Sequence, residues 1–295
     1  VRPAMKVDKF RTVIIYIIII LLGLVCLLPL LNIVAISFSS SAAVEGNMVG
    51  LIPVGFSTAA YKKILEDSQF WHSFLISVER VVLTLIINFV LIVLMAYPLS
   101  KTNAQFRGRN IYANLMIFAM LFNGGMIPTF LLVKSYGLLN TVWALVLPGA
   151  VPIFNVILVM NFFAAVPKEL EEAAFIDGAN PLQVLTKIFI PISKPVLATV
   201  SLFSIVGSWN DFYSGLIYMS KAAYYPLMTY IQSLQINVED LIKQGNLSAV
   251  VDSASLGNTN LNAAKIVVAV IPLLLIYPLL QRYFVSGIVV GSVKG

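Results

Sequence analysis

Long runs of apolar residues without charges constrain this chain more than any other feature. The first run extends from Thr12 to Val44 without one charged side chain. Only 11% of the 295 residues are Asp, Glu, Lys or Arg, and 59% are hydrophobic, whereas a soluble domain carries about 25% charged residues. Such a chain has too little polar surface to stay dissolved in water, so we predict an integral membrane protein.

The apolar runs predict helices. A helix needs about 20 apolar residues to cross the hydrocarbon core, and these runs are continuous rather than alternating. We predict an all-α fold of six spans, at residues 13–38, 76–99, 111–133, 142–166, 195–218 and 266–285. Prolines within or beside the spans predict kinks, at Pro29, Pro98, Pro128, Pro148, Pro152, Pro272 and Pro278. The basic start resembles a signal peptide, but the first run is too long for a cleaved signal, so we expect a span there.

The distribution of basic residues predicts the orientation. Six spans put both termini on one side. That side carries twelve of the 19 lysines and arginines, the other side carries six, and Arg80 lies within a span. Because basic residues favour the cytoplasm, we place residues 1–12, the tail 286–295 and the segment 167–194 there. Loops 39–75 and 219–265 would lie outside, and residues 13–285 would form the transmembrane domain.

The segment 167–194 carries clear local signals for two short helices. Pro167, followed by three glutamates, favours the start of a helix, and Gly178 favours its end. Asn180 before Pro181 is typical of a helix start, and this second helix would extend to about Phe189. Pro191 and Pro195 would end it and lead into the fifth span.

The first helix of this segment has a surface suited to a protein partner. Ala173 and Ala174 form a small-residue face that another backbone can approach closely, and Glu172 and Asp177 can pair with arginines. The composition equally allows an ordinary amphipathic loop between two spans. The residues alone leave both interpretations open.

Several strings of residues match a known family. Glu172-Ala173-Ala174, Asp177-Gly178-Ala179, Ile190-Pro191 and Pro195 resemble the EAA signature of permease subunits of binding-protein-dependent ABC importers. Trp209-Asn210-Asp211-Phe212 is similar to the carbohydrate subgroup. Gly124 to Thr129 and the tail Gly287 to Gly295 resemble a branch for complex oligosaccharides, similar to the smaller maltose-permease subunit. Ile190 departs conservatively from the leucine that is frequent before the proline.

The resemblance implies a type I importer fold in which the segment is a cytoplasmic coupling helix. Glu172 would form a salt bridge to the ATPase, Ala173 and Ala174 would pack in its groove, and Gly178 would make the turn. Asp177 and Pro191 belong to the same coupling motif. The implied partners are a homologous second permease in a heterodimer, two ATPase subunits, an extracytoplasmic binding protein and an oligosaccharide. The location would be the bacterial plasma membrane.

No catalytic site is predicted in this chain. It lacks the G-x-x-x-x-G-K-[ST] pattern that cradles ATP phosphates, so ATP and Mg²⁺ would bind to the partner ATPase. It has one histidine, His72, and one cysteine, Cys26, so we predict no metal site and no cofactor. We place His72 in an external loop with a surface role.

Polar residues near the end of the fifth span are candidates for the transport pathway or its gate. Asn210 and Asp211 would lie in the outer half of the membrane, where a carboxylate is costly and usually faces a cavity or the bundle interior. A polar helix cap is the alternative. Trp209 and Tyr213 would either stack on sugar rings or belong to an aromatic belt.

Other polar residues within the spans have a structural explanation. Arg80 lies near the outer edge, and we favour a side chain that snorkels to water over one that faces the pathway. Asn88, Asn123, Asn155 and Asn161 line a pore or join helices, and packing is the default.

The sequence therefore predicts a permease subunit of an ATP-driven oligosaccharide importer, with neutral and uronate-containing sugars both compatible. The alternative is an ion-gradient transporter, which should show internal repeats and carboxylate relays; we find neither. A membrane-embedded enzyme would need a nucleophile–base or metal constellation.

Overall fold

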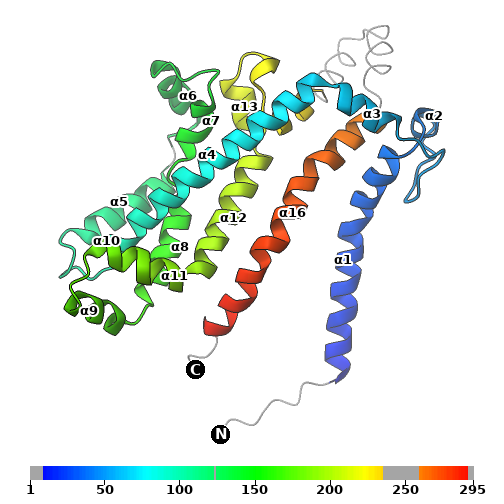
Figure 1. Ribbon diagram of the computed structural model, residues 1–295. Coiled ribbons are helices and arrows are strands. Elements are labelled where there is room, and N and C mark those ends of the chain that lie inside the picture. Colours follow the sequence, from blue (N-terminus) through cyan, green and yellow to red (C-terminus); the bar gives the residue numbers. More distant parts are fainter. Residues whose placement is uncertain (1–8, 123, 235–258, 292–295) are drawn as a thin grey trace. The chain divides into compact units, whose positions relative to one another are not determined.

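The computed structural model describes residues 9–122, 124–234 and 259–291, and these residues form helices and no β-strand (Figure 1). Three helices are long and apolar enough to cross a membrane: α1 (Lys9–Ser37), α4 (Ser68–Leu99) and α16 (Thr259–Gly291). Three bent helix pairs pass the same test, so the described residues hold between three and six candidate spans. The prediction of an all-helical fold is confirmed for these residues.

The chain divides into two compact units. One comprises Val1–Ser68 and Ser233–Val270, and the other comprises Gln69–Gln232 and Ile271–Gly295. The candidate residues of the segment 167–194 and of the fifth span all belong to the second unit. Much of the predicted outer loop 219–265 lies outside the described residues, as does the end of the tail.

Helix α1, in the first unit, is apolar on every side. The run that forms it contains no charge after Arg11, and its most apolar part is not buried by any of the described residues. A helix that is hydrophobic all round is typical of a membrane span. The side chains of this apolar part of α1 therefore face lipid or another subunit, whereas Ala35 and Ser37 near its C-terminal end are buried.

The predicted outer loop 39–75 folds into two short helices, α2 (Ser41–Glu45) and α3 (Ala59–Glu66), and the start of α4. Lys62 and Lys63 of α3 are exposed, as a solvated helix face requires. Asp67 directly follows α3, and its Oδ2 lies 2.7 Å from Lys265 Nζ of α16.

This ion pair explains why the last span starts earlier than predicted. We expected it at residue 266, because Lys265 counted as a charge outside the membrane, but α16 begins at Thr259. Lys265 is only 4% exposed, and a buried charge requires a partner of opposite sign. Asp67 supplies that partner.

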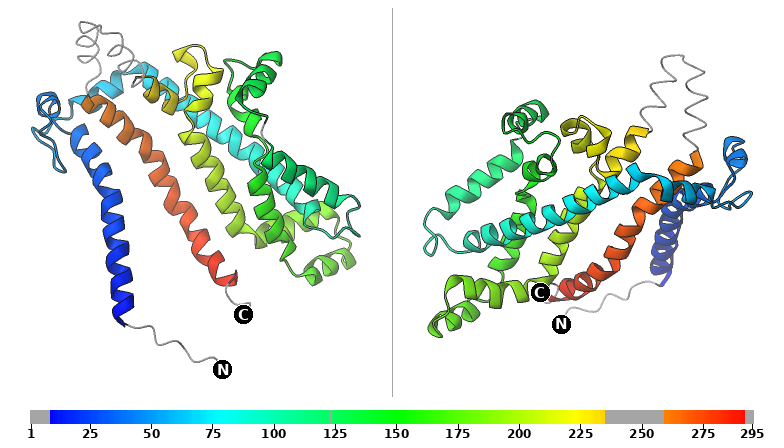
Figure 2. Two further views of the ribbon diagram at one scale, coloured as in Figure 1. Left: turned by 180° about the vertical axis from the view of Figure 1, so that it is seen from behind. Right: turned by 45° about the horizontal axis from the view of Figure 1, so that its top comes forward.

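The second unit contains most of the shorter helices. In chain order they are α5 (Arg109–Leu121), α6 (Met126–Ser135), α7 (Val142–Val146), η1 (Leu147–Gly149), α8 (Ile153–Ala164), α9 (Lys168–Ile176), α10 (Pro181–Val184), η2 (Leu185–Phe189), α11 (Ile190–Ile192), α12 (Lys194–Asn210), α13 (Tyr213–Tyr218) and η3 (Ala222–Tyr224). Helices α9 to α11 lie at one end of this unit and α6 and α13 at the other, with α8 and α12 running between them (Figures 1 and 2).

One apolar core joins the long helices of this unit to the short ones. It combines side chains from α4, α8, the α10–η2 segment and α12, among them Ile92, Val93, Ala96, Val156, Val159, Phe163, Val184, Phe189, Val196 and Val200. Protein interiors are close-packed and transmit strain. A displacement of the α10–η2 segment must therefore be transmitted to the spans that share its core.

The predicted spans 142–166 and 111–133 are both interrupted, and the first is bent at the prolines where a kink was expected. Helices α7–η1 and α8 meet at 47°, with Pro148 in η1 and Pro152 capping α8. The expected continuous helix 111–133 is instead α5 and α6. Gly125 precedes α6 with φ 92°, a backbone conformation that glycine adopts readily and that cannot continue a right-handed helix.

The expected span 195–218 is also interrupted. Helix α12 ends at Asn210, α13 begins at Tyr213, and Asp211 between them has an extended backbone. The predicted span 76–99 differs in the opposite way, because its helix, α4, is longer and begins at Ser68 rather than at residue 76. His72 therefore lies on this helix, exposed, and not in a loop.

Candidate coupling surface and polar cavity

The helix α9 begins and ends at the predicted residues. It follows Pro167 directly and carries Glu169 and Glu171 in its first turn, where negative charge stabilises a helix N-terminus. Gly178 has φ 80°, and its N–H donates to Phe175 O at 3.0 Å. The predicted start and stop signals are confirmed.

The second short helix starts with a capping box at Asn180. Gln183 N donates to Asn180 Oδ1, and Asn180 N donates to Gln183 Oε1, both at 2.9 Å. This reciprocal arrangement satisfies two backbone donors that a helix start leaves free. The helical segment continues through η2 and α11 to Ile192 and meets α12 at 84°, close to Pro191 and Pro195.

The outer face of α9 combines charged and apolar side chains. Glu172, Ala173 and Asp177 are exposed, and Ile176 is 86% exposed. Leu170, Phe175 and Leu182 are also exposed apolar residues in this segment. We call these seven residues the α9 face. A cluster of exposed apolar side chains rimmed by charges is typical of a protein interaction site.

The other residues of the predicted EAA motif contribute to the turn and the packing. Ala174 is half-buried and packs against the apolar core, so only Ala173 of the alanine pair lies on the α9 face. Gly178 makes the turn after α9, and Pro191 is exposed in α11.

Sequence reasoning missed the role of Glu171, the neighbour of Glu172. Glu171 is only 8% exposed. Its Oε2 accepts a hydrogen bond from Lys101 Nζ at 2.7 Å, and its Oε1 accepts one from Tyr97 Oη at 3.4 Å. The Lys101 ammonium also lies 4.1 Å from the centroid of the Tyr97 ring and 4.2 Å from that of Phe189.

These contacts tie α9 to the end of α4. Burial lowers the pKa of the Lys101 ammonium below its ordinary value, although the hydrogen bond and the charge of Glu171 act in the opposite direction. The side chains in this ion pair are 13% and 11% exposed, so water screens it little. A lysine directly after a span, on the same side as a glutamate-rich helix, is the only signal in the sequence that pointed to this contact.

A second ion pair lies at the opposite end of the unit. Arg80 of α4 is buried, which contradicts the expected side chain that snorkels to water. Its Nη2 lies 2.5 Å from Asp211 Oδ2, and its Nη1 donates to Asp211 O at 3.0 Å. The cost of burying the arginine is met by a carboxylate and a backbone carbonyl instead of by solvent.

Asp211 also caps the helix that follows it. Its Oδ1 accepts a hydrogen bond from Ser214 N at 3.1 Å. The two alternatives for this residue, a functional polar group and a helix cap, therefore do not exclude each other.

The other pathway candidates lie in different environments. Trp209 is 5% exposed and contacts Phe74 edge to face, with ring centroids 5.7 Å apart, so its ring is covered. Asn210 is exposed. Tyr213 is 54% exposed, and its hydroxyl lies 3.0 Å from Met126 Sδ. Helix α12, with 17 residues, spans about 25 Å and separates these residues from the α9 face.

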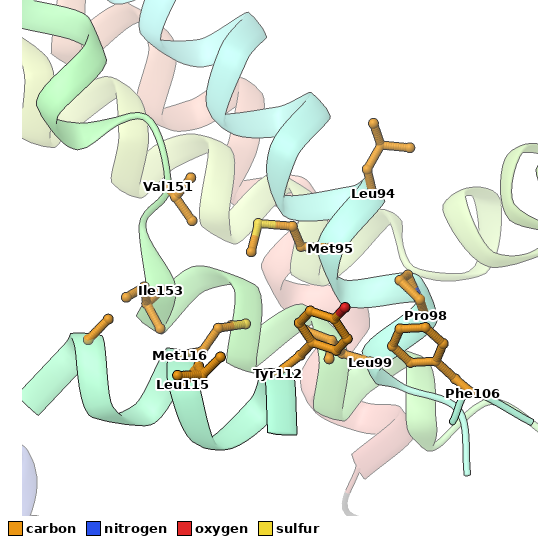
Figure 3. Close-up of a pocket in the computed structure, with 11 residues that line it drawn as sticks. Leu94, Met95, Pro98, Leu99, Phe106, Tyr112, Leu115, Met116, Val151 and Ile153 are labelled. Carbon is orange, nitrogen blue, oxygen red and sulfur yellow. The ribbon is translucent and has the colours of Figure 1, made fainter. Parts of the chain in front are cut away.

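Two cavities in this unit differ in chemistry. The larger, about 450 Å³, is apolar and lies between α4, α5 and the start of α8 (Figure 3); Leu94, Pro98, Leu115, Met116 and Ile153 are among its lining residues. It offers few groups that could bind a polar solute. The smaller, about 210 Å³, is lined by Arg80, Thr84, Asn88, Asn155, Ser204, Ser208 and Asp211 together with smaller and apolar residues. We call it the polar cavity.

One of the asparagines does join helices, as predicted. Asn88 Nδ2 donates to Ser204 Oγ of α12 at 3.2 Å. Asn155 is buried and Asn161 is exposed, while Asn123 lies outside the described residues. Within the described part of the chain, no three residues among His, Cys, Asp and Glu are grouped to hold a metal ion.

An all-helical membrane unit with a polar cavity and an exposed face for a partner is typical of a transport subunit. Comparison with known proteins identifies the family. Residues 4–290 match the binding-protein-dependent transport system inner membrane component family, and the chain belongs to it. Proteins of this family are membrane transport subunits and not catalysts. Their ATPase is a separate subunit, and they work in general with a binding protein and a second permease.

Relatives in Bacillus subtilis (strain 168) align with nearly the whole chain. Protein LplC is 41% identical over 273 residues, which cover 92% of this chain and 91% of that protein. The polygalacturonan/rhamnogalacturonan transport system permease protein YtcP is 40% identical over 288 residues, covering 98% and 99%. A solved bacterial ABC transporter involved in the import of the acidic polysaccharide alginate contains a chain with a TM-score of 0.82 and 32% identity, covering 96% of this chain and 100% of that one.

Proposed function

We propose that this chain is the permease subunit of an ATP-driven importer that carries an oligosaccharide through the bacterial plasma membrane. The family match over residues 4–290 carries this proposal. Membership of a family whose ATPase is a separate subunit favours an ATP-driven importer over the ion-gradient alternative.

The proposed topology has six spans within residues 13–285. The bent pairs α5–α6 and α7–α8 would each cross the membrane as one span, and the fifth span would begin with α12. The N-terminal residues 1–12, the coupling segment 167–194 and the tail 286–295 would all be cytoplasmic. Loops 39–75 and 219–265 would face outward. The distribution of basic residues supports this orientation, and so does the separation of the α9 face from the pathway candidates by the length of α12.

The proposed complex contains two different permeases, two ATPase subunits that bind ATP and Mg²⁺, and an extracytoplasmic binding protein. The α9 face would dock in a groove of one ATPase, where Glu172 and Asp177 pair with basic side chains. Ala173 and Ile176 would pack against apolar residues of the groove. The exposure of all four side chains supports this role.

The core of the second unit suggests how ATPase movement would reach the pathway. Closure of two ATPase subunits is a rigid-body movement, and α9 would follow the groove in which it sits. The α10–η2 segment shares a core with α4, α8 and α12, so these helices would move with it. The gate candidates Trp209, Asn210, Asp211 and Tyr213 lie at or just after the far end of α12.

We further propose that the transported oligosaccharide contains uronate units. The relative named for polygalacturonan and rhamnogalacturonan transport is 40% identical over 98% of this chain. The alginate importer chain is 32% identical over 96% of it. Both names describe acidic polysaccharides. Vesicles containing the complete importer should therefore take up polygalacturonan fragments when ATP is supplied, and uptake of neutral fragments alone would contradict this proposal.

The coupling role is tested by Glu172→Lys. This variant should insert into the membrane normally but bind less ATPase, because a lysine placed opposite basic side chains replaces attraction by repulsion. We expect ATP-dependent uptake to fall by about tenfold or more, since a charged hydrogen bond contributes about 1.5–3 kcal/mol. Co-purification of the ATPase and uptake into vesicles measure the two effects.

A matched control is Glu66→Lys on the exposed surface of α3. It makes the same change in charge far along the chain from α9, and it should leave ATPase binding and uptake unchanged. Normal ATPase binding and normal uptake in Glu172→Lys would refute the assignment of α9 as the coupling helix.

A further inference from the structure

A stripe of polar residues on α4 lines the polar cavity. Arg80, Thr84 and Asn88 are each four residues apart, so they lie on one face of the helix. All three line the polar cavity, and their exposed fractions are 4%, 8% and 4%. Three polar side chains in a row are unusual in a helix that is otherwise apolar enough to cross a membrane.

Each of these side chains has a polar atom without a hydrogen-bond partner. Five buried side-chain atoms in the described part of the chain are in this state, and three of them belong to residues that line the polar cavity: Arg80 Nε, Thr84 Oγ1 and Asn88 Oδ1. Buried polar groups are almost always hydrogen-bonded to protein, water or a ligand. Their concentration at one cavity indicates a site built to receive hydrogen bonds from a molecule that enters it.

The three atoms match the hydrogen-bonding capacity of hydroxyl groups. Arg80 Nε donates, Asn88 Oδ1 accepts, and the Thr84 hydroxyl does either. A sugar hydroxyl can likewise donate and accept, so sugar hydroxyls can serve both the donor and the acceptor atoms of this stripe. The charge of Arg80 is already paired with Asp211 at 2.5 Å. The cavity therefore has no net charge from this pair and favours hydroxyl over carboxylate groups.

We propose that the polar cavity is a glycan subsite of this subunit that binds one sugar unit through its hydroxyl groups. The proposal rests on the proposed function and adds to it the contact residues Thr84 and Asn88, with Arg80 at one end. The volume of about 210 Å³ corresponds to about seven water molecules, and a single sugar ring would replace them. The larger apolar cavity has no such complement of polar atoms.

Cysteine labelling tests whether solutes reach the cavity. Cys26 is the only cysteine, so Cys26→Ser provides a background in which Thr84→Cys or Asn88→Cys introduces the only thiol. A charged, water-soluble methanethiosulfonate reagent should modify both. Ile92→Cys is the matched control, because Ile92 lies one turn further along α4, is equally buried and belongs to the apolar core. It should react at least about tenfold more slowly, since a buried apolar site excludes the charged reagent.

Protection by sugar tests the ligand. The probe is polygalacturonan fragments, in vesicles whose complete importer has first been shown to take them up with ATP and whose Cys26→Ser background retains that uptake. Saturating fragments should slow modification of the thiols at positions 84 and 88 by about tenfold. Reactive thiols without protection would show a water-filled cavity only and overturn the subsite. Unreactive thiols would overturn the cavity itself. Because uptake is established beforehand, neither result reflects a failure of the proposed transport function.

A pair of variants at Thr84 distinguishes the effect of its hydroxyl group from the effect of its branched side-chain shape. Thr84→Val removes the hydroxyl and keeps the branched side chain, whereas Thr84→Ser keeps the hydroxyl. Thr84→Val should reduce the apparent affinity of uptake for the fragments by about three- to tenfold, with the amount of assembled ATPase unchanged, and Thr84→Ser should retain wild-type affinity. Equal affinities in the two variants would contradict a hydrogen bond from Thr84 to sugar.

Discussion

Glu171 and Glu172 are neighbours in the sequence, yet the structure gives them opposite surroundings. Successive residues on a helix point about 100° apart, so α9 can bury one carboxylate against Lys101 and expose the next. The EAA resemblance selected Glu172 and treated Glu171 only as a helix-starting charge. Sequence could not assign the ion pair because Lys101 lies 70 residues away, and only the packing of α9 on α4 brings the two together.

Arg80 and Asp211 show the same limit at the other end of the unit. The sequence singled out Asp211 as a costly charge within the membrane, and it correctly required a reason for that charge. It assigned Arg80 to the solvent because the partner lies 131 residues away. A charge near a membrane edge has two outcomes, water or a partner, and local sequence does not distinguish them.

The Arg80–Asp211 pair predicts a non-additive response to mutation. Asp211→Asn keeps the oxygen that caps Ser214 but removes the charge, and Arg80→Met removes the other charge. Asp211→Asn leaves the buried Arg80 unpaired, and Arg80→Met leaves the partly exposed Asp211 carboxylate unpaired. Each single variant should lower the temperature of thermal inactivation. The double variant should be more stable than the sum predicts, by about 0.5–3 kcal/mol. Thermal inactivation in detergent measures this, and strictly additive effects would show that the two charges do not interact.

At the scale of elements, helix ends were predicted best. Pro167, Gly178 and Asn180 define α9 and α10 through local hydrogen bonds, and local rules suffice for these. Breaks within spans were predicted less well. Pro148 and Pro152 predicted the bend before α8. The end of α12 at Asn210, in contrast, depends on the ion pair between Asp211 and the distant Arg80. No local pattern contains that information.

The Lys101–Glu171 contact predicts how firmly α9 is held. Lys101→Met keeps much of the side-chain volume but leaves the buried Glu171 without its cation. We expect amide hydrogen exchange in residues 168–178 to accelerate by about tenfold, because a hydrogen bond to a charged group contributes about 1.5–3 kcal/mol. Less transport per ATP hydrolysed should accompany this loosening, with ATPase binding retained.

Lys168→Met provides the control for this prediction. Lys168 is exposed at the start of the same helix, and its replacement also removes one lysine charge from the segment. Exchange that accelerates equally in both variants would mean that α9 responds to charge and not to the contact with α4.

At the scale of the whole molecule, composition alone established the class of protein. Few charges and long apolar runs require a membrane, and backbone hydrogen bonding then requires helices. The count of spans was harder, because residues 111–133, 142–166 and 195–218 contain breaks that the average hydropathy of a window does not register. The overall resemblance to permeases was correct because it rests on strings of residues spread along the chain.

The proposed orientation predicts a simple labelling pattern. In the Cys26→Ser background, a thiol at Lys168→Cys on α9 should react with a membrane-impermeant reagent only when the cytoplasmic side is open to it. A thiol at Lys63→Cys on α3 should react only from the outer side. Both parent side chains are exposed, so access to the side chain is not limiting. Reaction of both thiols from one side would refute the topology.

Helix α1 differs from α4, α9 and α12 because most of its side chains are exposed rather than packed on other helices. Its most apolar part is not buried by the described residues, so no packing surface among them selects among leucine, isoleucine and valine there. The sequence of such a helix is constrained by the hydrophobicity and the number of its residues, not by the shapes of its side chains. Exchanges among aliphatic residues in this helix should therefore have little effect on the protein. A single lysine at its midpoint would place a costly charge in the bilayer, and the loss of two turns would make the helix too short to span it.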